Sequence, residues 1–112
     1  MDLHPITSGH LLVIPRVHAS PLDELVELTG ERMFTVGARM AGALRGSSIV
    51  TEGINLFLAD GEAAGQEVFH AHLHVIPRFR SDGVVVTGDF TINQERMILD
   101  GHAAQLRSLL QA

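Results

Sequence analysis

The 112-residue sequence predicts a single α+β domain with a central antiparallel sheet. Two observations predict this class. Along the chain, a strand pattern is followed by a helix pattern and then by two strand patterns joined by a short loop, which is the order of an α+β fold. The chain is also no longer than one small domain, and no repeat or linker divides it, so we treat residues 1–112 as one unit.

Short apolar runs bounded by turn residues predict the strands. The expected strands cover residues 10–15, 53–58 and 67–76, with a candidate for a short fourth strand at residues 84–86. The first run ends at Pro15, and the third ends before Pro77. Residues 60–65, with two glycines, form the loop between the second and third strands.

Helix-start residues predict the helical segments. Ser20 is an expected N-cap with Pro21 at the first helical position, and a second start at Thr29 leads into a helix that ends at about Arg45. One face of this central helix carries Met33, Val36, Met40 and Leu44. A terminal helix is expected over residues 94–111, although Gly101 weakens that prediction.

Small residues make part of the central helix slim. They are Gly37, Ala38, Ala41 and Gly42. Because glycine lowers helix propensity, we expect a compensating close approach to a sheet or to another subunit.

Composition excludes several classes of function. The chain has no cysteine, so disulfides and thiolate sites are excluded. The net charge of −5 disfavours a nucleic-acid polymer as partner. No apolar run reaches the length of a membrane span, and no basic segment precedes the first apolar stretch as in a signal peptide. We therefore expect a soluble, cytoplasmic protein that has no membrane partner.

Residues 66–78, QEVFHAHLHVIPR, hold three of the seven histidines at alternate positions. On a strand, His70, His72 and His74 would share one face. Phe69, Ala71, Leu73 and Val75 would share the other face and pack on the core.

A zinc ion is one interpretation of this cluster, because histidine is a common zinc ligand. However, a strand places the Cα atoms of His70 and His74 roughly 13 Å apart, and no HExxH-like motif supplies a general base. A catalytic row fits better. A central imidazole can attack phosphorus while its neighbours stabilise the oxyanions, since phosphoryl transfer depends on positioning and charge.

The cluster and two upstream blocks resemble the histidine triad (HIT) family. HAHLHVI at residues 70–76 is similar to the triad signature, and DGEAAGQ at residues 60–66 is similar to the phosphate-side loop. SGHLLVIPRVH at residues 8–18 is similar to an earlier block with a fourth histidine. The resemblance spans residues 2–78. It implies a HIT-like fold with one main helix and a C-terminal helix.

The resemblance implies a nucleotide hydrolase or transferase that works through a covalent nucleotidyl-histidine. His72 would be the nucleophile at the α-phosphorus, and His70 and His74 would contact phosphate oxygens or the leaving group. His10 would support the tautomer and position of the nucleophile. His4, His18 and His102 receive no role.

It also implies a set of substrate-binding residues. Asp2 would hold the ribose hydroxyls, Leu3 would line the base pocket, and Gln66 and the amides from Glu67 onward would lie along the phosphate. Two positions depart from the family pattern, namely Ala59 in place of an amide and Glu67 in place of a hydroxyl residue. They weaken the inferred leaving-group contacts and the inferred proton donor.

The start of the sequence is a further departure. Family members usually carry another strand pair before the block that begins here at Asp2. We therefore expect an N-terminally shortened domain with an incomplete base pocket.

The resemblance implies a purine nucleotide as substrate and a homodimer as the assembly. It implies no required cofactor and no resident metal, although Mg²⁺ can accompany a polyphosphate. Both dinucleoside polyphosphates and nucleoside phosphoramidates remain open, and Pro77-Arg78 followed by Phe79-Arg80 slightly favours the polyphosphate. The alternatives are a non-catalytic nucleotide-binding module and a zinc-dependent hydrolase that uses the HxHxH strand.

Overall fold

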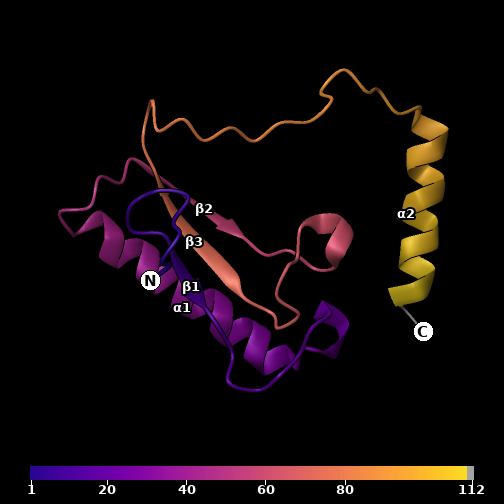
Figure 1. Ribbon diagram of the computed structural model, residues 1–112. Helices are drawn as coiled ribbons and strands as arrows, with labels where there is room; N and C mark the ends of the chain where they lie inside the picture. The colour runs from indigo at the N-terminus through magenta and orange to yellow at the C-terminus, as the bar shows by residue number, and fades with distance from the viewer. Residues whose placement is uncertain (111–112) are drawn as a thin grey trace.

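A computed structural model describes residues 1–110 of the chain (Figure 1). In chain order, the elements are β1 (Leu11–Val13), the 3₁₀ helix η1 (Leu22–Glu24), α1 (Glu27–Arg45), β2 (Gly53–Phe57), the 3₁₀ helix η2 (Glu62–Ala64), β3 (Leu73–Arg78) and α2 (Arg96–Leu110). The three strands form one antiparallel sheet in the order β1-β3-β2. The predicted α+β class is confirmed.

The register of the sheet decides which side chains share a face. Leu12 of β1 and Phe57 of β2 both lie opposite His74 of the central strand. Since opposite residues point to the same side, these three side chains share one face. Leu11 and Leu56, which lie opposite Val75, share the other face.

Helix α1 covers the Val75 face, and the core lies between the two layers. Its buried cluster consists of Leu11, Leu44 and Val75. At Gly37, an added Cβ would lie 2.9 Å from Leu73 Cδ2, so the helix approaches β3 closely there. This contact bears out the approach to a sheet that the small residues of the helix predict. The opposite face, which carries His74, is left without a helix (Figure 1).

The third strand begins later than predicted, at Leu73 instead of residue 67. Its neighbours explain the difference: β1 pairs only with Leu73–Val75, and β2 pairs only from His74 onward. Residues 67–72 have no ladder partner, and the amide of Ala71 donates instead to the carbonyl of Ala19. The prediction that all three histidines alternate along one strand is therefore wrong, since only His74 lies on β3. Phe69, expected in the core, is exposed.

Strand β3 also continues through Pro77, where the sequence predicts its end. The Pro77 carbonyl accepts a hydrogen bond from Thr7 Oγ1 at 2.5 Å, on the side away from β2. The proline nitrogen points to the same side, where β1 has already ended. A proline is tolerated in this central strand because no ladder bond is required of it there.

The helix starts differ from those predicted. The N-cap position of the short η1 is occupied by Pro21 instead of Ser20, and no side chain makes a capping hydrogen bond there. Helix α1 begins at Glu27, two residues before the predicted Thr29, and ends at Arg45 as predicted. Gly101 does not interrupt α2, which runs over Arg96–Leu110; the predicted end at residue 111 lies outside the described residues.

Residues 84–95 form no strand and lead to α2, and together residues 84–110 form an extended segment that we call the C-terminal arm. Figure 1 shows the arm running past the sheet and placing α2 well apart from it. The radius of gyration is 17.0 Å, whereas a compact chain of this length has about 13 Å. Within the described residues, no helix is long and apolar enough to cross a membrane.

Candidate active site

A hydrogen bond between two histidines forms the inner end of the site. His10, which directly precedes β1, is 2% exposed, and its Nε2 lies 2.8 Å from Nδ1 of His74. The amide of Ile6 donates to His10 Nδ1 at 3.0 Å, so that nitrogen holds a lone pair. A neutral His10 therefore carries its proton on Nε2 and donates it to His74, whose own proton must lie on Nε2.

Both imidazoles are held neutral. Burial lowers the pKa of His10 below its ordinary value, and the nearby Asp2 carboxylate offsets only part of this effect. Burial is also the main cause that lowers the pKa of His74, and the neighbouring His72 and His10 lower it further. At neutral pH, the tautomers deduced from the hydrogen bonds are thus the dominant species.

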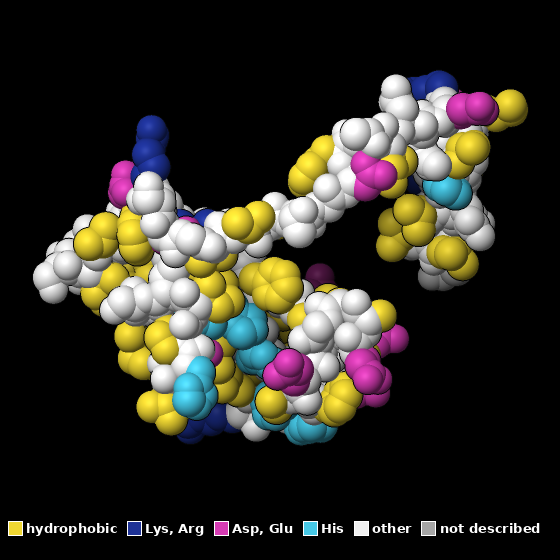
Figure 2. Space-filling model, turned by 45° about the horizontal axis from the view of Figure 1, so that its top comes forward, with side chains coloured by type: hydrophobic (Ala, Val, Ile, Leu, Met, Phe, Trp, Pro, Cys, Tyr) yellow, Lys and Arg dark blue, Asp and Glu magenta, His cyan; other side chains and the backbone are white. Residues whose placement is uncertain are grey.

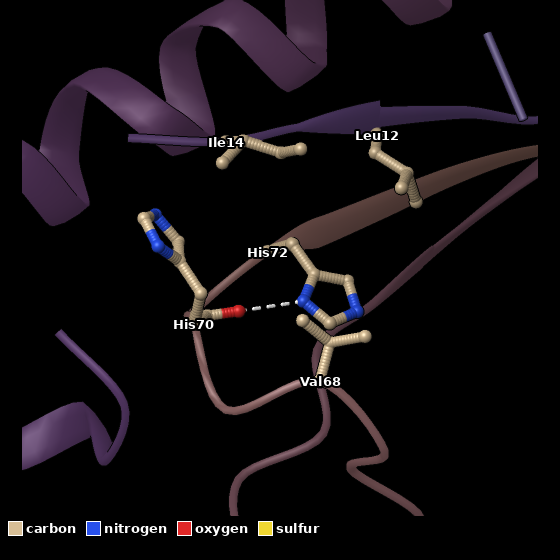
Figure 3. Close-up of a pocket in the computed structure, with 5 residues that line it drawn as sticks. All are labelled: Leu12, Ile14, Val68, His70 and His72. Atoms are coloured by element: carbon tan, nitrogen blue, oxygen red, sulfur yellow. Dashed lines mark hydrogen bonds between the residues drawn. The ribbon is translucent and has the colours of Figure 1, made fainter. Parts of the chain in front are cut away.

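His72 lies beside this pair and is oriented by the backbone. Its ring centroid is 4.9 Å from that of His74. Its Nδ1 lies 2.7 Å from the carbonyl oxygen of His70, as Figure 3 shows. Because a carbonyl oxygen can only accept, Nδ1 carries the proton and Nε2 holds the lone pair. No hydrogen bond within residues 1–110 engages that Nε2.

His70 forms the outer end of the row. Its Nε2 donates to the carbonyl oxygen of Pro15 at 2.8 Å, and its Nδ1 lies 3.4 Å from Nδ1 of His18. Pro15 ends the apolar run that begins with β1, so the turn after this strand fixes the His70 ring. Figure 2 shows the histidine side chains gathered on one face of the body, bordered by hydrophobic residues.

The row borders a hollow of about 320 Å³. Its lining consists of Leu12, Ile14, Val68, His70 and His72 (Figure 3). The apolar walls come from β1 on one side and from the loop before β3 on the other. A pocket with apolar walls and a few convergent polar groups is the usual form of a small-molecule site.

Comparison with known proteins places this arrangement in a family. The HIT domain model matches residues 1–81. The chain belongs to the HIT family. An uncharacterized HIT-like protein of Borreliella burgdorferi is 46% identical over 84 residues, which are 74% of this chain and 60% of that protein. The adenylylsulfatase HINT3 of Arabidopsis thaliana is 30% identical over 99% of this chain and 55% of its own length. The chain thus spans little more than half the length of these HIT relatives.

Solved HIT structures share the fold. The crystal structure of a HIT family protein from Bacillus anthracis has a TM-score of 0.85 and 32% identity, covering 96% of this chain and 77% of that one. A zinc-bound histidine triad family protein from Mycobacterium smegmatis has a TM-score of 0.72 and 39% identity, covering 97% of this chain and 78% of that one.

The structure brings together the four histidines that the sequence singled out in this HIT chain, but in a different order of contacts. His10 contacts His74 and not His72. The group that fixes the His72 tautomer is the His70 carbonyl.

The predicted substrate-binding residues lie at different depths. The Asp2 carboxylate is 3.7 Å from His10 Nδ1, so Asp2 borders the row. Leu3 is 86% exposed, and Glu67 is exposed as well. Gln66 is 3% exposed, and its Oε1 accepts the amide of Gly61, which closes the loop; its Nε2 has no partner.

The loop that ends at Gln66 depends on two glycines. Gly61 and Gly65 have φ angles of 92° and 89°, a region that other residues rarely adopt. They turn the chain around η2 and bring Gln66 back under Gly61. The predicted loop at residues 60–65 therefore carries a buried amide to the edge of the site.

Sequence reasoning missed His18 and the apolar walls of this HIT site. The signal for the walls was present: on a strand over residues 10–15, Leu12 and Ile14 share a face with His10. For His18 there was no local signal, because its neighbour His70 lies 52 residues along the chain.

Two groups of side chains are candidates for a metal ion. Ligand atoms of Asp2, His10 and His74 lie within 4.8 Å of one another. However, His10 Nε2 and His74 Nδ1 are hydrogen-bonded to each other, and His10 Nδ1 accepts a hydrogen bond from the amide of Ile6. An ion there would have to break these bonds. His18 and His70 face each other, but within residues 1–110 no third ligand completes a group with them, whereas zinc usually takes three or four protein ligands.

Proposed function

We propose that this chain is a nucleotide hydrolase that cleaves at the α-phosphate of a nucleoside 5′-phosphoryl substrate through a covalent nucleotidyl-histidine. One observation carries the proposal. The Nδ1 proton of His72 is held by a backbone carbonyl, so the lone pair on Nε2 is free beside the hollow. An imidazole in this tautomer is a nucleophile that needs no further activation by a base.

The proposed reaction has two steps. In the first, the Nε2 lone pair of His72 attacks the α-phosphorus, a P–N bond forms, and the bond to the leaving group breaks with its electron pair. In the second, water attacks the phosphorus, a P–O bond forms, and the P–N bond breaks with its electron pair returning to Nε2 of His72. The water loses one proton to the solvent, and the nucleoside monophosphate and free His72 are released.

His74 is the proposed donor in the first step. The hydrogen bond from His10 leaves the proton of His74 on Nε2, on the side of the ring away from His10. From there it can donate a hydrogen bond to a phosphoryl oxygen or to the leaving group, which stabilises the negative charge that develops there. Burial and the adjacent imidazoles lower the pKa of His74, so the ring stays neutral and keeps this single N–H as a hydrogen-bond donor. His70 is proposed to contact the phosphate from the outer end of the row.

The substrate class is proposed from the relatives and the hollow. The Arabidopsis relative is named as an adenylylsulfatase, whose substrate class would present an adenosine 5′-phosphoryl group. The apolar walls of Leu12, Ile14 and Val68 suit the flat apolar surface of a purine base. Dinucleoside polyphosphates and nucleoside phosphoramidates remain the two candidates. Arg78 does not favour either substrate, since its guanidinium is already hydrogen-bonded to Asp82, Asn55 and the carbonyl of Val84.

The test is turnover by His72→Ala. Wild-type protein is incubated with diadenosine tetraphosphate and with adenosine 5′-phosphoramidate, and AMP is resolved by HPLC. We expect His72→Ala to lower the rate by about 10³-fold or more, because the nucleophile is removed. His4→Ala is the matched control, since His4 is an exposed histidine outside the row, and it should retain wild-type turnover. Unchanged turnover in His72→Ala would refute the nucleophile.

The same assay separates the rival functions. Nucleotide binding without AMP release by wild type would support a non-catalytic module. Loss of activity in EDTA, restored by zinc, would support the zinc-dependent hydrolase. We expect full activity in EDTA, since the proposed steps use only the chain's own imidazoles and no metal cofactor.

We further infer that the protein is a cytoplasmic homodimer. The closely packed face of α1 is used within the chain, at Gly37. The support for a dimer comes instead from β2, an edge strand whose Leu56 and Phe57 are exposed. An exposed apolar edge of this kind is usually covered by another chain.

A further inference from the structure

The carbonyl of Pro77 lies beyond the end of the ladder between β1 and β3. Pro77 is fully buried inside β3, whereas β1 pairs only with residues 73–75 of that strand. Thr7, which is 8% exposed, supplies the missing donor: its Oγ1 donates to the Pro77 oxygen at 2.5 Å. Buried carbonyls without a donor are rare and costly in proteins, so the Thr7 hydroxyl takes the place of a strand neighbour here.

The backbone of Thr7 also shapes the loop that leads into β1. Its carbonyl accepts the amide of His10 at 3.1 Å, and the amide of Asp2 donates to the His10 carbonyl at 2.9 Å. Gly9 lies against the proline ring, since a Cβ added there would be 3.3 Å from Pro77 Cγ. This loop is thus fastened to β3 through a threonine side chain and not by strand pairing.

The fastened loop directs one amide at His10. Ile6, the neighbour of Thr7, donates its N–H to His10 Nδ1 at 3.0 Å. This donor keeps a proton off Nδ1, so the proton of neutral His10 lies on Nε2 and is donated to Nδ1 of His74. His74 then carries its own proton on Nε2, where the proposed reaction uses it as a hydrogen-bond donor.

The Asp2 carboxylate favours the opposite arrangement of protons. Its Oδ2 lies 3.7 Å from His10 Nδ1, close enough to attract a proton to that nitrogen. With a proton on Nδ1, His10 would present a lone pair at Nε2, and His74 would donate to it from Nδ1. The Nε2 of His74 would then hold a lone pair and could not donate to a phosphoryl oxygen. The amide of Ile6 therefore selects between two arrangements of the same two protons.

We propose that Thr7 is a positioning residue that fixes the proton arrangement of the histidine pair. Its hydroxyl holds the loop on β3, the loop holds the Ile6 amide on His10, and His10 leaves the proton of His74 on Nε2. The inference rests on the proposed function for the use of that N–H. The proton arrangement itself is a property of the chain that is measured without turnover.

The first test locates the protons in the wild type. In ¹H–¹⁵N spectra of ¹⁵N-labelled protein near neutral pH, protonated and unprotonated ring nitrogens have different shifts, so the tautomer of each ring is observed directly. We expect Nε2–H on both His10 and His74, with a coupling across the hydrogen bond from the Ile6 amide to His10 Nδ1. Nδ1–H on either of these two rings would overturn the proposal.

The second test removes the hydroxyl and restores it. Thr7→Val keeps the shape of the side chain but cannot donate to Pro77, whereas Thr7→Ser keeps the hydroxyl. We expect Thr7→Val to place a proton on Nδ1 of His10 and of His74 in a measurable fraction of molecules. Its kcat for AMP release should fall by up to about 100-fold, as a small misplacement away from the reacting atoms can cause. Thr7→Ser should keep the wild-type tautomers and most of the wild-type kcat.

Thr51→Val is the matched control. Thr51 is half-buried, and its Oγ1 donates to the carbonyls of Ile49 and Leu44 at 3.0 and 3.5 Å. It lies shortly before β2, outside the loop that holds His10. Its valine variant should lose stability in urea, while its tautomers and kcat stay at wild-type values. An equal loss of kcat in both valine variants, with unchanged tautomers, would mean that Thr7 contributes to stability alone.

The outcomes separate this inference from the proposed function. If Thr7→Val keeps the wild-type tautomers and kcat, the positioning role is wrong and the role of His72 stands. If His72→Ala keeps turnover, the proposed mechanism is wrong, but the tautomer spectra still test whether Thr7 holds the pair. If Thr7→Val does not fold, the wild-type spectra decide, because the absence of the coupling from the Ile6 amide overturns the proposal.

Discussion

At the residue scale, the hydrogen bonds of the histidine row fix where each proton lies. His10 Nδ1 accepts a hydrogen bond from the amide of Ile6, and His10 Nε2–H donates one to His74 Nδ1. His72 Nδ1–H donates a hydrogen bond to the carbonyl oxygen of His70. As a result, the row presents a lone pair on His72 and an N–H on His74 side by side. For the proposed reaction, this arrangement would supply an attacking group and a hydrogen-bond donor at once, without any prior proton transfer.

The neutrality of the buried pair predicts a pH dependence of stability. In the unfolded chain His10 and His74 protonate near pH 6.5, whereas burial lowers both pKa values in the folded chain. Between these values the unfolded state binds more protons, so the free energy of unfolding decreases as pH falls below about 6.5. The slope is at most about 1.4 kcal/mol per pH unit for each group.

Urea unfolding at pH 7.5, 6.5 and 5.5 measures this slope. We expect His10→Gln to have a shallower slope than wild type, and His4→Gln, which changes an exposed histidine, to keep the wild-type slope. Equal slopes in all three proteins would mean that the His10 ring titrates normally in the folded state.

The sequence alone predicts the four histidines but not their contacts. The alternation HxHxH and the block containing His10 are local patterns, so they can be recognised without a structure. The partner of each ring depends on atoms far along the chain, such as Pro15 for His70 and His10 for His74. Gln66 shows the same limit, because its burial beneath Gly61 follows from the path of the loop.

At the scale of elements, the sheet shows why strand limits are hard to predict. Residues 67–72 have a strand-like sequence pattern. A strand forms only where a neighbouring strand supplies the backbone hydrogen-bond partners, and these residues have no such neighbour. Pro77 gives the converse case, since it lies inside β3 where one neighbour has ended. Local propensity predicts the existence and order of β1, α1, β2 and β3, while their ends are set by their neighbours.

Two glycines of α1 give a test of the close contact between the helix and β3. An added Cβ at Gly37 would lie 2.9 Å from Leu73 Cδ2, whereas at Gly42 it would meet nothing within 4 Å. We expect Gly42→Ala to raise the free energy of unfolding by about 0.5–1 kcal/mol through helix propensity. Gly37→Ala should lower it by roughly 1–3 kcal/mol, because overpacking outweighs that gain.

Thermal and urea unfolding of the two alanine variants measure these changes in the free energy of unfolding. The comparison is matched, since both changes add one methyl group to the same helix. A stabilisation of similar size in both variants would show that α1 and β3 are not in close contact at Gly37.

At the scale of the whole molecule, the chain divides into a packed body and an arm. The core lies between α1 and the sheet, and no residue of α2 belongs to it. The sequence predicts the terminal helix but not its separation from the body. An amphipathic pattern shows that a helix will pack, and it does not show whether the surface it packs on belongs to the same chain.

Limited trypsin digestion tests this division. The arm carries Arg96 and Arg107, while Arg78 is held in the sheet by hydrogen bonds to Asp82 and Asn55. In dilute protein we expect the first cuts at the two arm arginines, because this segment has no buried contacts in its own chain. If the proposed homodimer covers the arm, these cuts should slow at higher concentration.

Mass spectrometry of a digestion time course at two protein concentrations identifies the sites. First cuts within α1 or at Arg78 would contradict the division into body and arm. Cleavage of the arm at a rate independent of concentration would argue that it stays uncovered.

The histidine row is held mainly by main-chain atoms, namely the amide of Ile6 and the carbonyls of Pro15 and His70. The hollow beside it is shaped by the side chains of Leu12, Ile14 and Val68. Substitutions in these walls can therefore alter which ligand fits while the reacting groups stay in place. Under the proposed function, such a division would allow the substrate range to diverge by single replacements without the loss of catalysis on the way.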